Sequence, residues 1–81
     1  MVNTQEITDQ NIKTLQQELI NNLIKIRKCQ GISQKKLEEI SGVQQPIIAR
    51  MEKHNTSPNL MTLQKLVSSL GFKLTLTPIS K

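Results

Sequence analysis

Two adjacent glutamines, Gln44 and Gln45, and nearby Arg50 are the side chains of this sequence best suited to recognising another surface through hydrogen bonds. A glutamine amide carries a donor and an acceptor together, the pair that an adenine edge requires, and an arginine can bond a guanine or a phosphate. Ile47 and Ala49 lie between them and could meet a thymine methyl group. Taken alone, the glutamines are better explained as ordinary solvated turn residues. Whether they contact bases depends on the secondary-structure elements that position them.

Those elements are two short helices joined by a tight turn. Ser33 suits the cap of a helix over residues 34–40, and Gly42 ends this helix because glycine adopts a positive φ without steric cost. A second helix is predicted over residues 45–53, with Pro46 in its first turn. Proline is tolerated there because the N–H groups of the first turn have no hydrogen-bond partner within the helix. This layout is a helix-turn-helix, and it sets both glutamines at the exposed start of the second helix.

A longer helix precedes this pair and another follows it. The first is predicted from Thr8 or Asp9 to a stop at Gly31, and the fourth runs from the cap Asn59 to a stop at Gly71. Apolar residues spaced by three or four predict the buried faces of the four helices. These residues are Ile12, Leu15, Leu19, Leu23, Ile26, Leu37, Ile40, Ile48, Met51, Leu60, Leu63, Leu66, Val67 and Leu70, with Val43 filling the turn.

Residues 72–78 change the apolar period from that of a helix to alternation, because Leu74 and Leu76 are separated by lysine and threonines. This pattern predicts a strand. A lone strand in a helical chain has no partner for its backbone groups, so it either hangs free or pairs with the same strand of a second copy about a two-fold axis. Pairing is the favoured interpretation, and the expected dimerisation residues are Phe72, Leu74, Thr75 and Leu76.

The charge of the chain is unevenly distributed along its 81 residues, which suffice for one small domain. The net charge is +5: residues 1–24 carry −2, whereas residues 25–81 carry ten Lys and Arg against three Glu, a net of +7. A basic body suggests a polyanionic partner, although a lysine-rich solvated surface explains the same numbers. Phe72 is the only aromatic residue, which disfavours single-stranded nucleic acids, since their bases stack on aromatic rings.

Enzymatic and membrane functions find little support. Cys29 is the only cysteine and His54 the only histidine, and they form no metal-ligand set and no nucleophile–base pair. We therefore expect no catalytic residues, no metal, no cofactor and no small-molecule substrate. No apolar run approaches the roughly 18 residues of a membrane span, and the first residues lack a signal-peptide layout. The expected compartment is the cytoplasm.

From about residue 19 to residue 71 the chain resembles the Cro/C1-type helix-turn-helix DNA-binding domain. The shared features are Ile32-Ser33-Gln34-x-x-Leu37, Ser41-Gly42-Val43, Ile48-x-x-Met51-Glu52, Ser57-Pro58 and Leu63-x-x-Leu66 running to Leu70-Gly71. The resemblance implies an all-α domain of four principal helices over residues 9–71. A flexible tail over residues 1–8 and a dimerisation strand and tail over residues 72–81 would flank it.

A narrower resemblance is to the HigA-like antitoxins of type II toxin–antitoxin modules. It rests on Gly31 to Glu39, Gln45 to Glu52 and the closing stretch Leu70 to Pro78. It implies a homodimeric transcriptional repressor that binds its own double-stranded operator and neutralises a toxin, usually an mRNA interferase of the HigB/RelE type. Phage and plasmid repressors share most of the motif, so a stand-alone repressor stays open, as does a protein-interaction module without DNA binding.

The resemblance assigns roles to particular residues. It places DNA base contact at Gln44, Gln45, Ala49 and Arg50. Phosphate contact is expected at Gln34, Lys35, Lys36, Lys53, Asn55 and Thr56, since a helix start and flanking lysines suit an anionic backbone. Glu52 is expected to hold the recognition helix by pairing with Arg27. Two departures are His54, where glycine is usual, and Gln44, where a capping Ser or Thr is common.

The toxin contact is the hardest site to place from the sequence. One candidate is the acidic N-terminal segment together with Ile12, Ile20 and Ile24, because a toxin that acts on RNA tends to be basic. Dimer packing or an ordinary role in the core is the favoured explanation of the same isoleucines.

Overall fold

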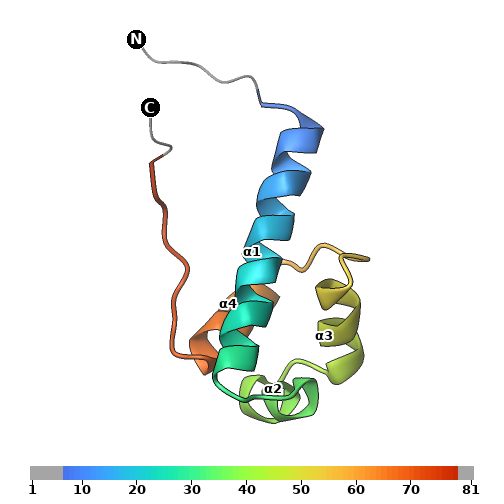
Figure 1. Cartoon of the computed structure of the whole chain (residues 1–81), viewed down its shortest axis with the longest axis vertical. Helices are drawn as coiled ribbons and strands as arrows, with labels where there is room; N and C mark the ends of the chain where they lie inside the picture. Colours follow the sequence, from blue (N-terminus) through green and yellow to red (C-terminus); the bar gives the residue numbers. More distant parts are fainter. Residues whose placement is uncertain (1–6, 79–81) are drawn as a thin grey trace.

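The computed structural model describes residues 7–78, and these residues form four helices (Figure 1). Helix α1 spans Asp9–Cys29, α2 spans Gln34–Ser41, α3 spans Gln45–Glu52 and α4 spans Leu60–Ser69. The three short helices gather around the C-terminal half of α1, while its N-terminal half projects beyond them. Most of the tail predicted over residues 1–8, and residues 79–81 of the predicted C-terminal tail, lie outside the described residues.

Side-chain caps begin three of the helices where the sequence predicts them. The Thr8 hydroxyl accepts a hydrogen bond from the Asn11 N–H group at 3.1 Å, and the Ser33 hydroxyl accepts one from Lys36 at 2.9 Å. The Asn59 amide oxygen caps α4 in the same way, accepting from the N–H group of a residue three positions on at 2.8 Å. The predicted helix starts are thereby confirmed, because each cap satisfies a donor that the first turn leaves without a partner.

One apolar core holds the four helices together. Its buried side chains are Ile20, Leu23, Leu37, Val43, Ile48, Met51, Leu66, Val67 and Leu70. Nearly all of these were predicted from the apolar spacing, and Val43 fills the turn as expected at 6% exposure. Ile20, which the sequence offered as a toxin contact, belongs to this core, and Ile24 packs against it.

Four residues predicted to be buried are instead exposed. Ile12 and Leu15 lie on the projecting half of α1, where no other helix of the described chain covers them. Leu60 is the first residue of α4, and Ile40 lies in the last turn of α2. Side chains at the ends of helices fall at the rim of the core, so an apolar period alone overestimates their burial.

The strand predicted over residues 72–78 does not form in the single chain, since residues 7–78 contain no strand. After α4 these residues continue as an extended segment that runs back towards the N-terminal end of α1 (Figure 1). A strand requires hydrogen bonds from a second strand, and a helical chain supplies none. Leu74 packs against the core, whereas Leu76 is 99% exposed. Within residues 7–78, no helix is long and apolar enough to cross a membrane.

Candidate nucleic-acid interface

The turn between α2 and α3 is built from local backbone chemistry. Gly42 has φ +81°, and its N–H group donates to the Glu38 carbonyl at 2.9 Å, which closes α2. The Val43 N–H group donates to the Ser41 hydroxyl at 3.1 Å, and the Val43 side chain enters the core. Gln44 is the N-cap residue of α3, but its side-chain amide makes no capping hydrogen bond with the first turn of the helix.

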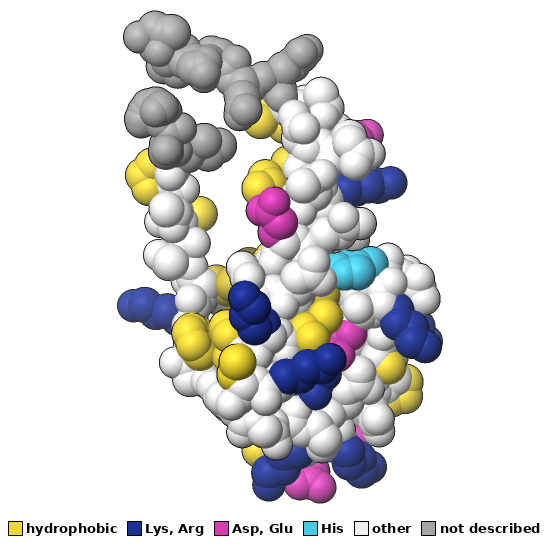
Figure 2. All heavy atoms as spheres, in the orientation of Figure 1, with side chains coloured by type: hydrophobic (Ala, Val, Ile, Leu, Met, Phe, Trp, Pro, Cys, Tyr) yellow, Lys and Arg dark blue, Asp and Glu magenta, His cyan; other side chains and the backbone are white. Residues whose placement is uncertain are grey.

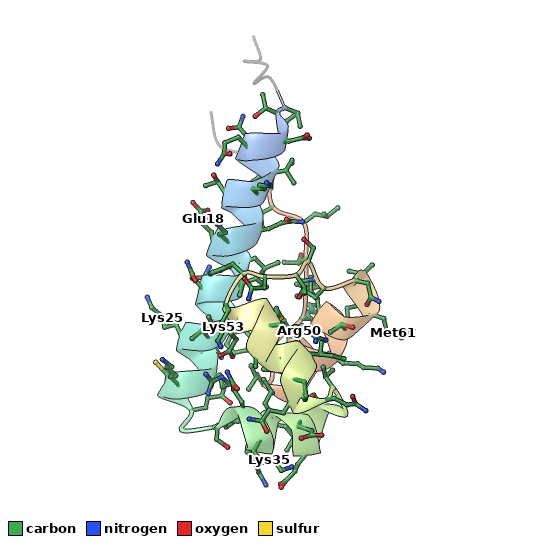
Figure 3. All side chains as sticks on the ribbon, turned by 90° about the vertical axis from the view of Figure 1, so that its right-hand side faces the viewer. Glu18, Lys25, Lys35, Arg50, Lys53 and Met61 are labelled. Carbon is green, nitrogen blue, oxygen red and sulfur yellow. The ribbon has the colours of Figure 1, made fainter. Side chains whose placement is uncertain are left out.

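Helix α3 has one buried face and one open face. Ile48 and Met51 are 0% and 1% exposed, and they anchor the helix to the core. Among the predicted base-contact residues, Gln44 and Arg50 are exposed, whereas Gln45 and Ala49 are half-buried at the edge of the open face. Figure 3 shows α3 facing the viewer with Arg50 and Lys53 along it. The structure therefore brings the predicted base-contact residues together on one short exposed helix.

The predicted ion pair between Arg27 and Glu52 is confirmed. The Arg27 Nε atom donates to Glu52 Oε2 at 2.8 Å and its Nη2 atom donates to Oε1 at 2.9 Å, with both side chains only 9% exposed. The remaining Nη1 atom of Arg27 donates to the Ile32 carbonyl at 2.8 Å. A two-pronged arginine–carboxylate bond of this kind fixes direction as well as distance. It holds the end of α3 at a set angle against α1.

Gln34 joins the same network, which the sequence did not reveal. Its Nε2 atom donates to Glu52 Oε1 at 2.9 Å, so one carboxylate receives bonds from α1 and from the start of α2. Gln34 is half-buried beside α3. The network ties the predicted phosphate contact at Gln34 to the recognition helix itself. Nothing in the sequence around Gln34 indicates this bond, because its partner lies 18 residues away along the chain.

The predicted phosphate-contact lysines flank α3 at both ends. Lys35 and Lys36 lie on α2, where their Nζ atoms approach Glu38 at 3.5 Å and Glu39 at 3.6 Å. Lys53, Asn55 and Thr56 follow α3 and are exposed. Figure 3 shows Lys35 at the lower end of the molecule and Lys53 near the opposite end of α3. Exposed ion pairs are weak, so Lys35 and Lys36 remain available to an anionic partner.

His54 adopts a left-handed backbone with φ +61°, at the position where the resemblance leads one to expect glycine. Its Nε2 atom lies 3.1 Å from the Asn21 Oδ1 atom of α1, a hydrogen bond that the sequence did not predict. Histidine enters this region more readily than branched residues do. The bond fastens the beginning of the α3–α4 loop to α1 and thereby offsets the cost of the unusual backbone.

The predicted dimerisation residues lie apart from this face. Phe72, Thr75 and Leu76 are exposed, and Leu74 is half-buried against the core. Within the described residues, the backbone of residues 73–78 makes no hydrogen bond. This segment therefore offers a backbone edge that residues 7–78 leave unpaired. Among residues 7–78, no group of three or more His, Cys, Asp or Glu side chains is placed to hold a metal ion.

The open face of a short second helix, buried on its other side and flanked by lysines, defines a helix-turn-helix of the DNA-binding class. Comparison with known proteins agrees: the profile of a helix-turn-helix family matches residues 23–76. This chain belongs to that family, the Cro/C1-type helix-turn-helix proteins, which are DNA-binding transcriptional regulators.

Several relatives support the assignment. An uncharacterized HTH-type transcriptional regulator of Haemophilus influenzae is 48% identical over 77 residues, covering 95% of this chain and 76% of the relative. The HTH-type transcriptional regulator PuuR of Escherichia coli is 40% identical over 52 residues, covering 64% of this chain and only 28% of PuuR. A solved structure of a toxin–antitoxin module from Streptococcus pneumoniae has a TM-score of 0.72 and 45% identity, and the match covers 91% of this chain and 84% of that chain.

Proposed function

We propose that this protein is an antitoxin that represses its own operon by binding operator DNA and that also neutralises a toxin encoded beside it. The observation that carries the DNA part is the open face of α3, where Gln44 and Arg50 are exposed while Ile48 and Met51 bury the opposite face. Base contact is proposed at Gln44, Gln45, Ala49 and Arg50. Phosphate contact is proposed at Gln34, Lys35, Lys36, Lys53, Asn55 and Thr56.

The antitoxin part is supported by the likeness to the Streptococcus pneumoniae toxin–antitoxin module at 45% identity over most of both chains. It is also supported by apolar side chains that the described chain leaves uncovered. Ile12 is 40% exposed and Leu15 is 55% exposed on the projecting half of α1. The proposed toxin is a basic mRNA interferase of the HigB/RelE type, to which the acidic N-terminal segment is complementary. The site of action would be the cytoplasm, where operator DNA lies.

A homodimer is part of this proposal, because operator binding by helix-turn-helix proteins uses two half-sites related by a two-fold axis. The backbone of residues 73–78, which makes no hydrogen bond within the described chain, is the proposed edge for pairing with a second copy. Phe72, Leu74, Thr75 and Leu76 would form that contact.

The test is binding of the purified protein to labelled DNA from directly upstream of its operon, with scrambled DNA as the control, at two salt concentrations. We expect tight binding to the upstream DNA that weakens steeply with salt, because each neutralised phosphate releases counterions. Equal binding to both DNAs, or none, would exclude self-repression and favour a repressor of other sites or a pure interaction module.

The antitoxin role is tested separately by co-expressing the chain with the product of a small neighbouring gene. We expect the chain to restore growth that this product arrests, and to co-purify with it. A version lacking residues 1–11 addresses the toxin contact, since undiminished rescue would remove the N-terminal segment from it.

A further inference from the structure

A hollow of about 350 Å³ lies between α1 and the loop that joins α3 to α4. Its polar lining includes Lys13, Gln16, Gln17, Asn55, Thr56 and Ser57, and the other lining residues are mostly apolar. Asn55 and Thr56 are already proposed as phosphate contacts, whereas the three α1 residues have no role in the helix-turn-helix. The hollow therefore joins the projecting half of α1 to the flank of the proposed DNA interface.

The hollow is held in shape by the loop. His54 opens the loop with φ +61° and lies in the hollow's wall, where its Nε2 atom is 3.1 Å from Asn21 Oδ1 on α1. Pro58 restricts the other end of the same wall. A wall fixed to α1 in this way need not be rearranged when a ligand arrives, which lowers the cost of binding.

The chemistry of the polar lining suits a phosphate. Amide and hydroxyl groups and one lysine ammonium line the hollow, and none of its lining residues is Asp or Glu. Lys13 makes no ion pair within the described residues, in contrast to Lys35 and Lys36, which approach glutamates of their own helix. Lysine, glutamine, asparagine, threonine and serine are all among the side chains that bond DNA phosphates.

The position of the hollow points to the DNA backbone as the source of that phosphate. The α3–α4 loop leaves the end of α3 where Lys53 lies and returns towards α1 (Figures 1 and 3). A duplex seated on the open face of α3 must carry its backbone past this end of the helix. We propose that the hollow receives a DNA phosphate outside the reach of the helix-turn-helix, with Lys13, Gln16 and Gln17 as additional backbone contacts. This inference rests on the proposed DNA binding.

The first test compares Lys13→Gln with Lys25→Gln, a matched control that removes an exposed lysine from the same helix but does not line the hollow. For Lys13→Gln we expect binding to weaken on operator and scrambled DNA alike, and the slope of log affinity against log salt to fall by about one unit. Lys13→Arg should retain the wild-type slope. An unchanged slope for Lys13→Gln, or an equal change in Lys25→Gln, would overturn the proposal.

The second test neutralises the phosphates flanking one half-site, one at a time, with methylphosphonates. At one position, neutralisation should weaken binding of the wild-type protein but cause no further loss in Lys13→Gln. If every position weakens both proteins equally, Lys13 faces no phosphate and the proposal fails.

Two further experiments distinguish a DNA phosphate in the hollow from a free phosphate compound and from a failure of the proposed DNA binding. Inorganic phosphate is titrated against the DNA-free protein while NMR signals of residues 13–17 and 54–57 are followed. We expect no saturable shift below millimolar concentration, and tight binding would assign the hollow to a free phosphate compound instead of DNA. Failure of the wild-type protein to bind upstream DNA would reject the proposed function itself. Normal binding by the wild-type protein, with no effect of Lys13→Gln, would reject only the proposal that the hollow receives a DNA phosphate.

Discussion

Helix α1 is one continuous helix with two different environments. Every side chain from residue 9 to residue 18 is exposed, whereas from Ile20 onwards a side chain is buried at nearly every turn. The apolar spacing is the same in both halves, since Ile12 and Leu15 belong to the same stripe as Leu23, which lies in the core. The comparison teaches that apolar period identifies a helical face but does not say what covers it.

The two halves also differ in charge and surface. In the view of Figure 2, most Lys and Arg side chains lie over the lower part of the molecule, where hydrophobic side chains also show; the upper part of α1 and the C-terminal segment show further hydrophobic side chains. The body of the protein, residues 20–71, is therefore suited to an anionic partner. The projecting half of α1 leaves Ile12 and Leu15 exposed, and its Lys13 side chain lines the hollow.

The largest effect expected from this comparison concerns Glu52 in the body. Glu52→Ala leaves the Arg27 guanidinium buried without its partner and removes the acceptor of Gln34, so we expect the free energy of unfolding to fall by about 3–5 kcal/mol. Urea unfolding followed by circular dichroism measures this loss. Glu39→Ala is the control, because its ion pair with Lys36 is exposed and worth less than about 1 kcal/mol. Similar losses in both variants would show that the Arg27–Glu52 pair does not hold the body together.

A nearly equal loss is expected from the core. Ile48 is 0% exposed, so Ile48→Ala removes buried methyl groups and leaves a cavity, at a cost of about 2–5 kcal/mol in the same urea experiment. A loss below about 1 kcal/mol would mean that the core can collapse around the missing side chain and that α3 is loosely held.

A third prediction separates stability from recognition within the body. Gln45→Ala should weaken binding to upstream DNA by roughly 1–3 kcal/mol while leaving scrambled DNA binding and unfolding almost unchanged. Fluorescence anisotropy with both DNAs provides the measurement. If the two DNAs lose affinity equally, Gln45 contributes no base readout.

The smallest effect on stability is expected in the projecting half. Leu15 is 55% exposed, so Leu15→Ala should change the free energy of unfolding by no more than about 0.5 kcal/mol. The same variant should weaken self-association or toxin capture, measured by sedimentation and co-purification. A large loss of stability in dilute monomer would instead show that the projecting half is packed in solution.

The helices and their ends could be predicted because their determinants are local. Thr8, Ser33 and Asn59 cap within three residues of themselves, and Gly42 stops α2 by its own backbone conformation. The strand predicted over residues 72–78 is absent from the single chain because strand formation depends on a second segment that local alternation does not supply.

Only some of the side-chain hydrogen bonds between distant residues can be predicted from the sequence. The Arg27–Glu52 pair was expected from the family resemblance, since charge pattern alone gives no reason to join residues 25 positions apart. The bonds from Gln34 to Glu52 and from His54 to Asn21 were missed for the same reason. The base-contact and phosphate-contact assignments remain predictions, and the structure adds that Gln45 and Ala49 sit at the edge of the open face.

The bond from Gln34 to Glu52 also bears on the phosphate contact proposed at Gln34, because it fixes which way the amide points. A carboxylate can only accept, so the Gln34 amide must turn its nitrogen, not its oxygen, towards Glu52. That nitrogen has a second N–H group, which is left to donate to an external acceptor such as a phosphate. A glutamine at position 52 could both donate and accept, so the Gln34 amide could then face it with either its nitrogen or its oxygen. In the second case the Gln34 oxygen would be the atom that bonds residue 52, and the direction of the amide would no longer be fixed. Glu52 thus favours Gln34 as a hydrogen-bond donor in the proposed phosphate contact.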